Sequence, residues 1–423
     1  MNFLSAKKWY RAYLPKWLRL LFGVLRIKDR WFIHQCQREI PTIVNSLKNK
    51  ESINVAFLAM SVSFWKYDNL FQLMQAHSRF NPVVIIAPRP NLDPSIKART
   101  VEAMKTFFAK KKYIVLESLK TFDPDILFYS QPYDTSVEDE FSIYNNPHKL
   151  YCYVPYAFWI SNYRWGYDTM LHNVAWKLFF PTQIHLNNAK RLALNRGANV
   201  CVTGYPQADR FLEPSTEPTN CWKIKEPHCK RIIWAVHHSV LPNGRSDCSS
   251  FMEYATLFLE LAKKYSDSIQ IAFKPHPILK NNLYLHPKWG KARTDAYYKE
   301  WNEYSNTFLA EEDYIDLFKQ SDALIHDCGS FMAEYLYTQK PCMYIGAPRN
   351  GILCPFGELA LNAHYLVSDF DVETFINSVV IKNNDPKQQD RKNIFSEYLL
   401  PPNHKLASQN IFDAILRDIT KSC

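Results

Sequence analysis

The sequence predicts an α/β protein with two parallel-sheet domains that face each other across a cleft. Short apolar segments, such as 53–59 (INVAFLA) and 82–87 (PVVIIA), alternate with helical stretches in both halves of the chain. A short apolar run bounded by turn residues is typical of a strand buried on both faces of a parallel sheet. The length of 423 residues also exceeds what one hydrophobic core usually supports, which favours two domains.

The first half of the chain contains seven expected strands, at 53–59, 82–87, 113–116, 125–129, 150–154, 176–180 and 200–203. Helices are expected over about 65–78 and 95–110. Alternating strands and helices indicate an open parallel sheet covered on both faces. The stretch 207–228 has several prolines and no periodicity, so it is predicted to be a linker.

The second half repeats this pattern with expected strands at 231–236, 269–273, 307–309, 323–326 and 341–345. Expected helices cover about 250–265, 292–304 and 314–319, and another follows the polar turn at 327–330. The predicted organisation is a basic amphipathic helical segment (1–50), a first domain (51–206), the linker (207–228), a second domain (229–385) and a helical tail (386–423). The amphipathic stretch 407–419 is expected to pack back on the first domain.

Composition excludes several classes of site. The chain has only 10 glycines and contains neither GxGxxG nor GxxxxGK[ST], so a glycine-rich nucleotide loop is not expected. Its 10 cysteines form no CxxC pair, and no acidic cluster has the spacing of metal ligands. We therefore expect no metal or other cofactor, and reduced thiols in a cytoplasmic protein, because no secretory signal is evident.

The first 30 residues are strongly basic, with eight Lys or Arg against one Asp, within a chain of net charge +10. Trp and Leu residues lie between these cations, but no apolar run reaches the roughly 18 residues needed to span a bilayer. This pattern predicts a peripheral anchor on an anionic membrane, at the inner face of the cell membrane. The alternative is a first helix packed on its own domain. Nucleic acid is not an expected partner, because the rest of the chain lacks a basic stripe.

Polar residues follow three of the second-half strands. They are His237-His238-Ser239, then Lys274 and His276 on either side of Pro275, and then the turn Asp327-Cys328-Gly329-Ser330 with Glu334 one turn later. A tight turn that opens a helix presents backbone N–H groups to phosphate, and a cation beside an imidazole suits a diphosphate. These residues therefore predict a site for a phosphorylated, nucleotide-linked ligand. The alternative is a solvated Lys274 and a His276 that caps a turn.

The order and spacing of these pieces, together with Lys340-Pro341, resemble the CDP-glycerol glycerophosphotransferase family of teichoic-acid and capsule polymerases and primases. The resemblance implies two Rossmann-like domains facing across a cleft (GT-B type), the first on the acceptor side and the second binding the donor. It also implies transfer of glycerol phosphate, or a related polyol phosphate, from a CDP-linked donor to a lipid-linked or polymeric acceptor.

The resemblance further implies roles for individual residues. His276, His238 and His237 are expected to be catalytic, and His276 is expected to contact the diphosphate or protonate the departing nucleotide phosphate. Glu334 is expected to reach the ribose hydroxyls. The complete set expected to bind the donor or its phosphates is Lys274, Asp327, Gly329, Ser330, Glu334 and Ser239.

The first domain departs from the family pattern. Family members carry a His-Gly-Thr turn there, whereas this chain reads Tyr153-Val154-Pro155-Tyr156, so the expected acceptor base is missing and His172 is the nearest candidate. The surrounding aromatic residues provide either a platform for a sugar or polyol chain or core packing; they are Tyr151, Tyr153, Tyr156, Phe158, Trp159, Tyr163, Trp165 and Tyr167. The departure keeps two alternatives open: a nucleotide-sugar-dependent GT-B glycosyltransferase of capsule or lipopolysaccharide synthesis, and a non-catalytic scaffold that binds a nucleotide-linked precursor.

Overall fold

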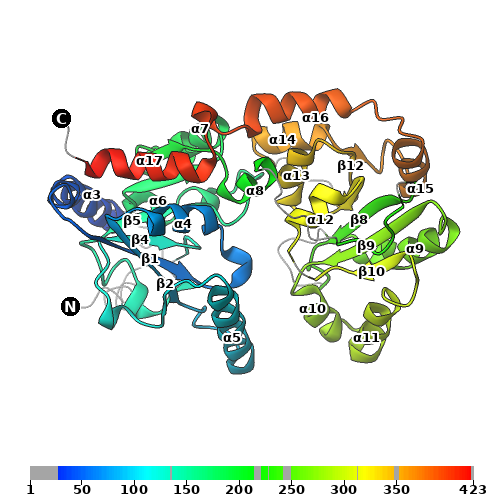
Figure 1. Cartoon of the computed structure of the whole chain (residues 1–423), viewed down its shortest axis with the longest axis horizontal. Helices are drawn as coiled ribbons and strands as arrows, with labels where there is room; N and C mark the ends of the chain where they lie inside the picture. Colours follow the sequence, from blue (N-terminus) through cyan, green and yellow to red (C-terminus); the bar gives the residue numbers. More distant parts are fainter. Residues whose placement is uncertain are drawn as a thin grey trace, which may run out of the picture. The chain divides into compact units, whose positions relative to one another are not determined.

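The computed structural model describes residues 27–133, 136–213, 221–226, 228–241, 249–311, 313–346 and 352–420 (Figure 1). The chain forms two compact units. Unit 1 contains the chain up to Ala157, the segment Tyr163–Gln207 and the chain from Pro401 onward; unit 2 contains Phe158–Asn162 and Ala208–Leu400. Most of the basic N-terminal segment, residues 1–26, lies outside the described residues.

Unit 1 is built on a seven-stranded parallel sheet with the strand order β3-β2-β1-β4-β5-β6-β7. Its strands are β1 (Ile53–Ala59), β2 (Phe80–Ile86), β3 (Val115–Leu116), β4 (Ile126–Tyr129), β5 (Leu150–Tyr153), β6 (Lys177–Phe180) and β7 (Val200–Val202). Its helices are α3 (Ile27–Leu47), α4 (Asp68–Ala76), α5 (Pro94–Lys110), α6 (Met170–Val174), α7 (Gln183–Leu192) and α17 (Ala407–Ile419).

Both faces of this sheet are buried. In β1 the alternate residues Val55 and Phe57 belong to one hydrophobic cluster, whereas Ala56 and Leu58 belong to another on the opposite face. A strand that is covered on both sides has no polar face, which explains why these segments read as continuous apolar runs rather than as alternating patterns.

The C-terminal helix α17, drawn in red in Figure 1, completes one of these clusters. Its residues Ile411 and Ile415 pack in the same cluster as Leu70 and Phe71 of α4, as the amphipathic pattern of 407–419 predicts. The preceding segment meets the turn after β7. There Gly204 has φ +89°, and a side chain at this position would come within 2.8 Å of Pro401. A residue other than glycine would therefore be both strained and obstructed.

Unit 2 is built on a six-stranded parallel sheet with the strand order β10-β9-β8-β11-β12-β13. Its strands are β8 (Lys230–Val236), β9 (Ile269–Pro275), β10 (Thr307–Leu309), β11 (Ala323–His326), β12 (Cys342–Tyr344) and β13 (Tyr365–Leu366). Its helices include α8 (Asp209–Leu212), α9 (Phe251–Lys264), α10 (Leu279–Leu285), α11 (Gly290–Glu300), α12 (Ile315–Gln320), α13 (Phe331–Glu334), α14 (Pro355–Asn362), α15 (Val372–Thr374) and α16 (Gln388–Ile394).

The predicted α/β class with two parallel sheets is confirmed. Helices α7 and α14 and strand β13 were not predicted. The helix expected after the turn at 327–330 is only one α-helical turn, α13, continued by the 3₁₀ turn Tyr335–Thr338. In the described part of the chain, no helix is both long enough and apolar enough to cross a membrane.

Candidate active site at the carboxyl edge of unit 2

Three adjacent strands of unit 2 bring the predicted polar residues together. Strands β9, β8 and β11 are neighbours, with Val236 paired to Pro275 and Ala235 paired to His326. Residues that follow these strands must therefore meet at one edge of the sheet. They do: the ring centroids of His238 and His276 are 4.5 Å apart, and those of His237 and His238 are 4.3 Å apart.

Burial keeps His276 and His238 uncharged at neutral pH. Burial, with smaller contributions from the nearby histidines and the Lys274 ammonium, lowers the pKa of His276 to about 3. Burial also lowers the pKa of His238 to about 4, with a smaller contribution from His237. Lys274 itself is only 8% exposed. At neutral pH the site thus holds neutral imidazoles beside one buried ammonium, an arrangement that an incoming anion would stabilise.

The backbone fixes which nitrogen of His276 carries the proton. The N–H of Ile278 donates to His276 Nδ1 at 3.2 Å, so this nitrogen acts as an acceptor. In a neutral imidazole the proton then lies on Nε2, which is available as a hydrogen-bond donor. His237 is held in a similar way, because Ser239 Oγ lies 2.9 Å from His237 Nδ1.

Asp327 supports this edge of the sheet from inside the unit. Its carboxylate is fully buried and accepts hydrogen bonds from the backbone N–H of His237 at 2.6 Å and of Ser250 at 2.7 Å. Ser250 Oγ donates a third bond at 2.9 Å. Burial raises the pKa of Asp327, and these bonds oppose the shift. The carboxylate expected to bind the donor instead ties the end of β11 to the end of β8 and the start of α9.

The turn after β11 offers less to phosphate than the sequence indicates. Gly329 and Ser330 are half-buried, and Ser330 occupies the N-cap position of α13 without a capping bond from its side chain. However, α13 spans only four residues, so its macrodipole is small. The positive charge of the site therefore comes chiefly from Lys274.

Two other predicted residues are buried in structural contacts. Glu334 is 2% exposed and accepts a hydrogen bond from the Tyr314 hydroxyl, so the expected contact with a ribose would need this side chain to turn outward. Lys340 Nζ donates to the carbonyl oxygens of Lys319 and Ser321 at 2.6 and 2.5 Å, and burial lowers its pKa. Lys340 thus joins the end of α12 to the start of β12.

The candidate acceptor base in unit 1 has a structural role. His172 is fully buried in α6, and its Nδ1 accepts the backbone N–H of Thr169 as half of a capping box. Burial lowers the pKa of His172 to about 3. Within the described ranges, no three His, Cys, Asp or Glu side chains are grouped so that they could hold a metal ion.

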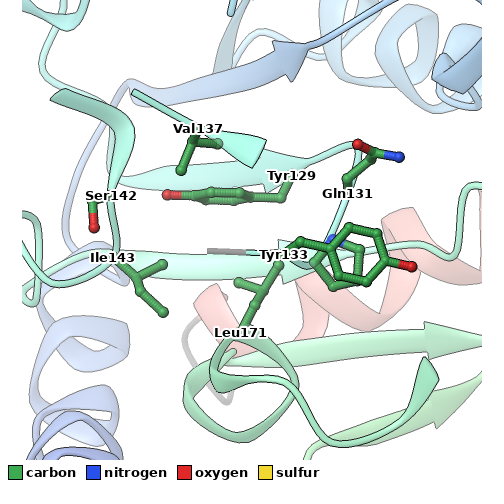
Figure 2. A pocket seen from close by; sticks show the side chains of 8 residues that line it. Tyr129, Gln131, Tyr133, Val137, Ser142, Ile143 and Leu171 are labelled. Carbon is green, nitrogen blue, oxygen red and sulfur yellow. The ribbon is translucent and has the colours of Figure 1, made fainter. Parts of the chain in front are cut away.

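The carboxyl edge of unit 1 carries tyrosines and an arginine instead. Figure 2 shows a small pocket with Gln131 and Tyr133 at one end and Ser142 and Ile143 at the other. The aromatic residues singled out between positions 151 and 167 divide into two groups. Tyr151, Tyr153, Phe158 and Tyr167 are core residues, whereas Tyr163 and Trp165 are 41% and 45% exposed and stack at 5.5 Å.

Sequence reasoning missed several residues of both edges. Ser250 was identified only as the start of a helix, although it also bonds to Asp327. Arg89 and Gln131 were not singled out. The available signal was an arginine between two prolines directly after one strand, and a glutamine directly after another.

Comparisons with known proteins agree with this architecture. Residues 182–347 match the family described as CDP-Glycerol:Poly(glycerophosphate) glycerophosphotransferase, and this range includes His237, His238, Lys274, His276 and Asp327. No curated protein matches the chain.

Among solved structures, the wall teichoic acid polymerase TagF is similar at 14% identity and a TM-score of 0.56, covering 95% of this chain and 97% of that one. A histidine-to-asparagine variant of TagF soaked with CDPG is also similar, at 14% identity and a TM-score of 0.54 over 96% and 98% of the two chains. The UDP-GlcNAc 2-epimerase of Neisseria meningitidis, bound to UDP-GlcNAc, shares 15% identity at a TM-score of 0.54 over 86% and 100%.

At these identities the solved structures support the fold, whereas the family match identifies the chemistry. The resemblance read from the strand-end residues is confirmed over the matched range, and with it the enzyme class. Residues 182–347 thus match the CDP-glycerol:poly(glycerophosphate) glycerophosphotransferase family, in agreement with the resemblance read from the strand ends.

Proposed function

We propose that the protein transfers glycerol phosphate from CDP-glycerol to a hydroxyl group of a lipid-linked or polymeric acceptor. The observation that carries this proposal is the gathering of Lys274, His276 and His238 at one sheet edge, inside the matched residues. The family description names CDP-glycerol and poly(glycerophosphate), and a TagF crystal was soaked with CDPG. Both support a CDP-linked donor at this edge.

The reaction needs charge stabilisation more than it needs an acid. The oxygen of the acceptor hydroxyl group attacks the phosphorus that bears glycerol, and the bond from this phosphorus to the CMP oxygen breaks. CMP leaves with the electron pair, and the proton of the acceptor hydroxyl group is released to solvent. A phosphate monoester has a second pKa of about 6, so CMP departs as a dianion at neutral pH without taking up a proton. We assign Lys274 and the Nε2–H of His276 to the charge that develops on the departing phosphate.

Asp327 acts through His237 in this proposal. The His237 backbone N–H donates to the buried carboxylate at 2.6 Å, and this bond holds the backbone of His237 and His238 in position. Ser330 lies at the end of the neighbouring strand β11 and is placed as a phosphate contact, together with the backbone of Gly329. Asp327 is therefore a positioning residue, and His276 is a catalytic one.

Replacing His276 with Ala tests the assignment. We expect CMP release from CDP-glycerol to fall by about 10²- to 10⁴-fold, the usual contribution of a residue that handles charge or protons in the transition state. The matched control is His286→Ala, because His286 is another histidine of unit 2 and follows α10. Undiminished turnover in the His276 variant would remove this residue from the mechanism.

We also propose that the protein works at an anionic membrane surface, in synthesis of a teichoic-acid-like or capsule polymer at the inner face of the cell membrane. The support is the excess of eight basic residues over one acidic residue in residues 1–30. Flotation with vesicles that contain anionic lipid should recover the full chain, and neutral vesicles should not. Equal recovery on both vesicles would contradict an electrostatic anchor.

A further inference from the structure

Arg89 lies at the carboxyl edge of the unit 1 sheet, and its guanidinium group contacts uncharged side chains. It follows β2, and its Nε and Nη2 both donate to Gln131 Oε1, at 2.9 and 2.6 Å. Its guanidinium carbon lies 5.3 Å from the centre of the Phe64 ring. Two of the five N–H groups of an arginine are thus used, which leaves three for a ligand.

No carboxylate neutralises this arginine within the described residues, since its recorded partners are the amide of Gln131 and the ring of Phe64. Gln131 is 1% exposed, and its amide nitrogen Nε2 has no hydrogen-bond partner in the described structure. A half-buried cation held by a neutral amide, next to an unused buried donor, is a combination that an anion completes.

Two tyrosine hydroxyl groups are close to this cation. Tyr133 and Tyr156 hydrogen-bond to each other through their hydroxyl oxygens at 3.0 Å. Tyr156 packs against Phe64, the ring that faces Arg89, with ring centroids 5.1 Å apart. Burial raises the pKa of both phenols, and Arg89 opposes the shift in each case. Both hydroxyl groups therefore remain protonated at neutral pH. Because one of them donates to the other, the pair adds at most one O–H donor to the site.

An exposed aromatic surface continues from Tyr133. The ring of Trp165 lies 6.0 Å from the ring of Tyr133 and stacks on Tyr163. These two residues are among the exposed aromatic side chains of the chain, at 45% and 41%. Apolar faces beside hydrogen-bonding groups suit the C–H face of a sugar or polyol.

The topology of the sheet favours a ligand at this position. In the order β3-β2-β1-β4-β5, the chain direction across the sheet reverses between β1 and β4. Ligands of open parallel sheets bind outside the carboxyl ends of the strands at such a switch point. Phe64 follows β1, Gln131 follows β4, Arg89 follows β2 and Tyr156 follows β5, so the group surrounds the switch point.

We propose that Arg89, with Gln131, Tyr133 and Tyr156, binds an anionic phosphodiester of the acceptor, while Tyr163 and Trp165 contact its polyol or sugar. The site gives unit 1 an acceptor-binding surface without the histidine turn that the family carries. That the bound anion belongs to the acceptor rests on the proposed function. The binding of a phosphodiester by Arg89 does not, and it can be measured separately.

The test measures binding of glycerophosphoglycerol, a soluble phosphodiester with free glycerol hydroxyl groups, to the full chain by titration calorimetry. We expect Arg89→Ala to weaken this binding by about 10- to 100-fold, the range for losing charge-assisted hydrogen bonds. Binding of CDP-glycerol to the same variant should be unchanged. Glycerol, which lacks the phosphate, should show no dependence on Arg89.

Arg99→Ala is the matched control, because Arg99 is an exposed arginine of the same unit, and its Nε donates to the Ser95 carbonyl at 3.4 Å. Arg89→Gln, which keeps the side chain polar, decides the matter by the same criterion if Arg89→Ala fails to fold. The proposal is overturned if the wild-type chain does not bind glycerophosphoglycerol, or if neither Arg89 variant weakens it. Loss of CMP release from CDP-glycerol in a chain that still binds the phosphodiester through Arg89 would instead refute the proposed function alone.

Discussion

The carboxyl edges of the two parallel sheets differ in chemistry although they arise in the same way. In unit 2, strands β8, β9 and β11 end in histidines and a lysine, with ring centroids as close as 4.3 Å. In unit 1, strands β1, β2, β4 and β5 lead into Phe64, Arg89, Gln131 and Tyr156. One edge holds imidazoles that burial keeps neutral beside a buried lysine, and the other holds an arginine and tyrosines that stay protonated at neutral pH.

This difference indicates a division of labour. Neutral imidazoles beside a buried ammonium respond to an incoming diphosphate by gaining charge, which suits the chemical step. Arginine and tyrosine, whose protonation is fixed at neutral pH, suit recognition of an anion and its neighbouring hydroxyl groups. Under the proposed function, unit 1 would bind the acceptor without supplying the histidine base that the family pattern leads us to expect.

The comparison extends to acid stability, where we expect the largest effect. The pKa is lowered to between about 3 and 4 for His238, His276 and His364 of unit 2, and to about 3 for His172 of unit 1. An unfolded histidine titrates near 6.5. Below that pH the unfolded chain takes up protons that the folded chain does not, so stability is full above pH 6.5 and falls as the pH drops toward the folded pKa.

Each of the well-buried histidines His276, His364 and His172 costs roughly 2 kcal/mol of stability at pH 5, and the more exposed His238 costs less. Unit 2 therefore loses about 4–5 kcal/mol and unit 1 about 2 kcal/mol. Hydrogen exchange measured peptide by peptide at pH 7 and pH 5, corrected for intrinsic rates, should show β8 and β9 losing more protection than β1 and β4. Equal loss in the two sheets, or earlier loss in unit 1, would contradict the assignment of neutral buried histidines to unit 2.

The sequence predicts much of this fold because both sheets are covered on two faces. Buried parallel strands give uninterrupted apolar runs, and the expected positions 53–59, 307–309 and 323–326 coincide with β1, β10 and β11. Short or polar elements were not predicted because they lack a long apolar run. Strand β13 has two residues, and α7 carries the polar sequence QIHLNNAKRL.

The candidate site was predictable only where strand ends carry distinctive residues. His237, His238, Lys274 and His276 could be placed together because parallel strands end at the same edge. Which side a carboxylate faces could not be read from the pattern, so Asp327 and Glu334 were expected to contact the ligand although both are buried. The cluster around Arg89 joins residues as much as 42 positions apart through single hydrogen bonds, which leave no periodic pattern in the sequence.

Two buried aspartates, one in each unit, allow the effect of a carboxylate on donor binding to be separated from its effect on stability. Asp327 of unit 2 and Asp168 of unit 1 each accept several hydrogen bonds; Asp168 binds Asn173 at 2.7 Å and the backbone of Leu194 at 3.0 Å. Removing either carboxylate leaves buried donors without partners. We expect Asp327→Ala and Asp168→Ala each to lower the free energy of unfolding by about 3–5 kcal/mol, and the Asn variants to lower it by less.

Only the Asp327 variants should affect the donor site, because only Asp327 holds the backbone of His237. Urea unfolding measures the stability of each variant, and calorimetry measures its binding of CDP-glycerol. Asp327→Asn should lower the affinity for CDP-glycerol by about tenfold, which corresponds to the loss of roughly one hydrogen bond to a charged acceptor. Asp168→Asn should leave donor binding unchanged at temperatures where the chain is folded. If both variants lowered the affinity for CDP-glycerol equally, the carboxylate of Asp327 would matter only for folding. The positions of the histidines would then be set by the strands alone.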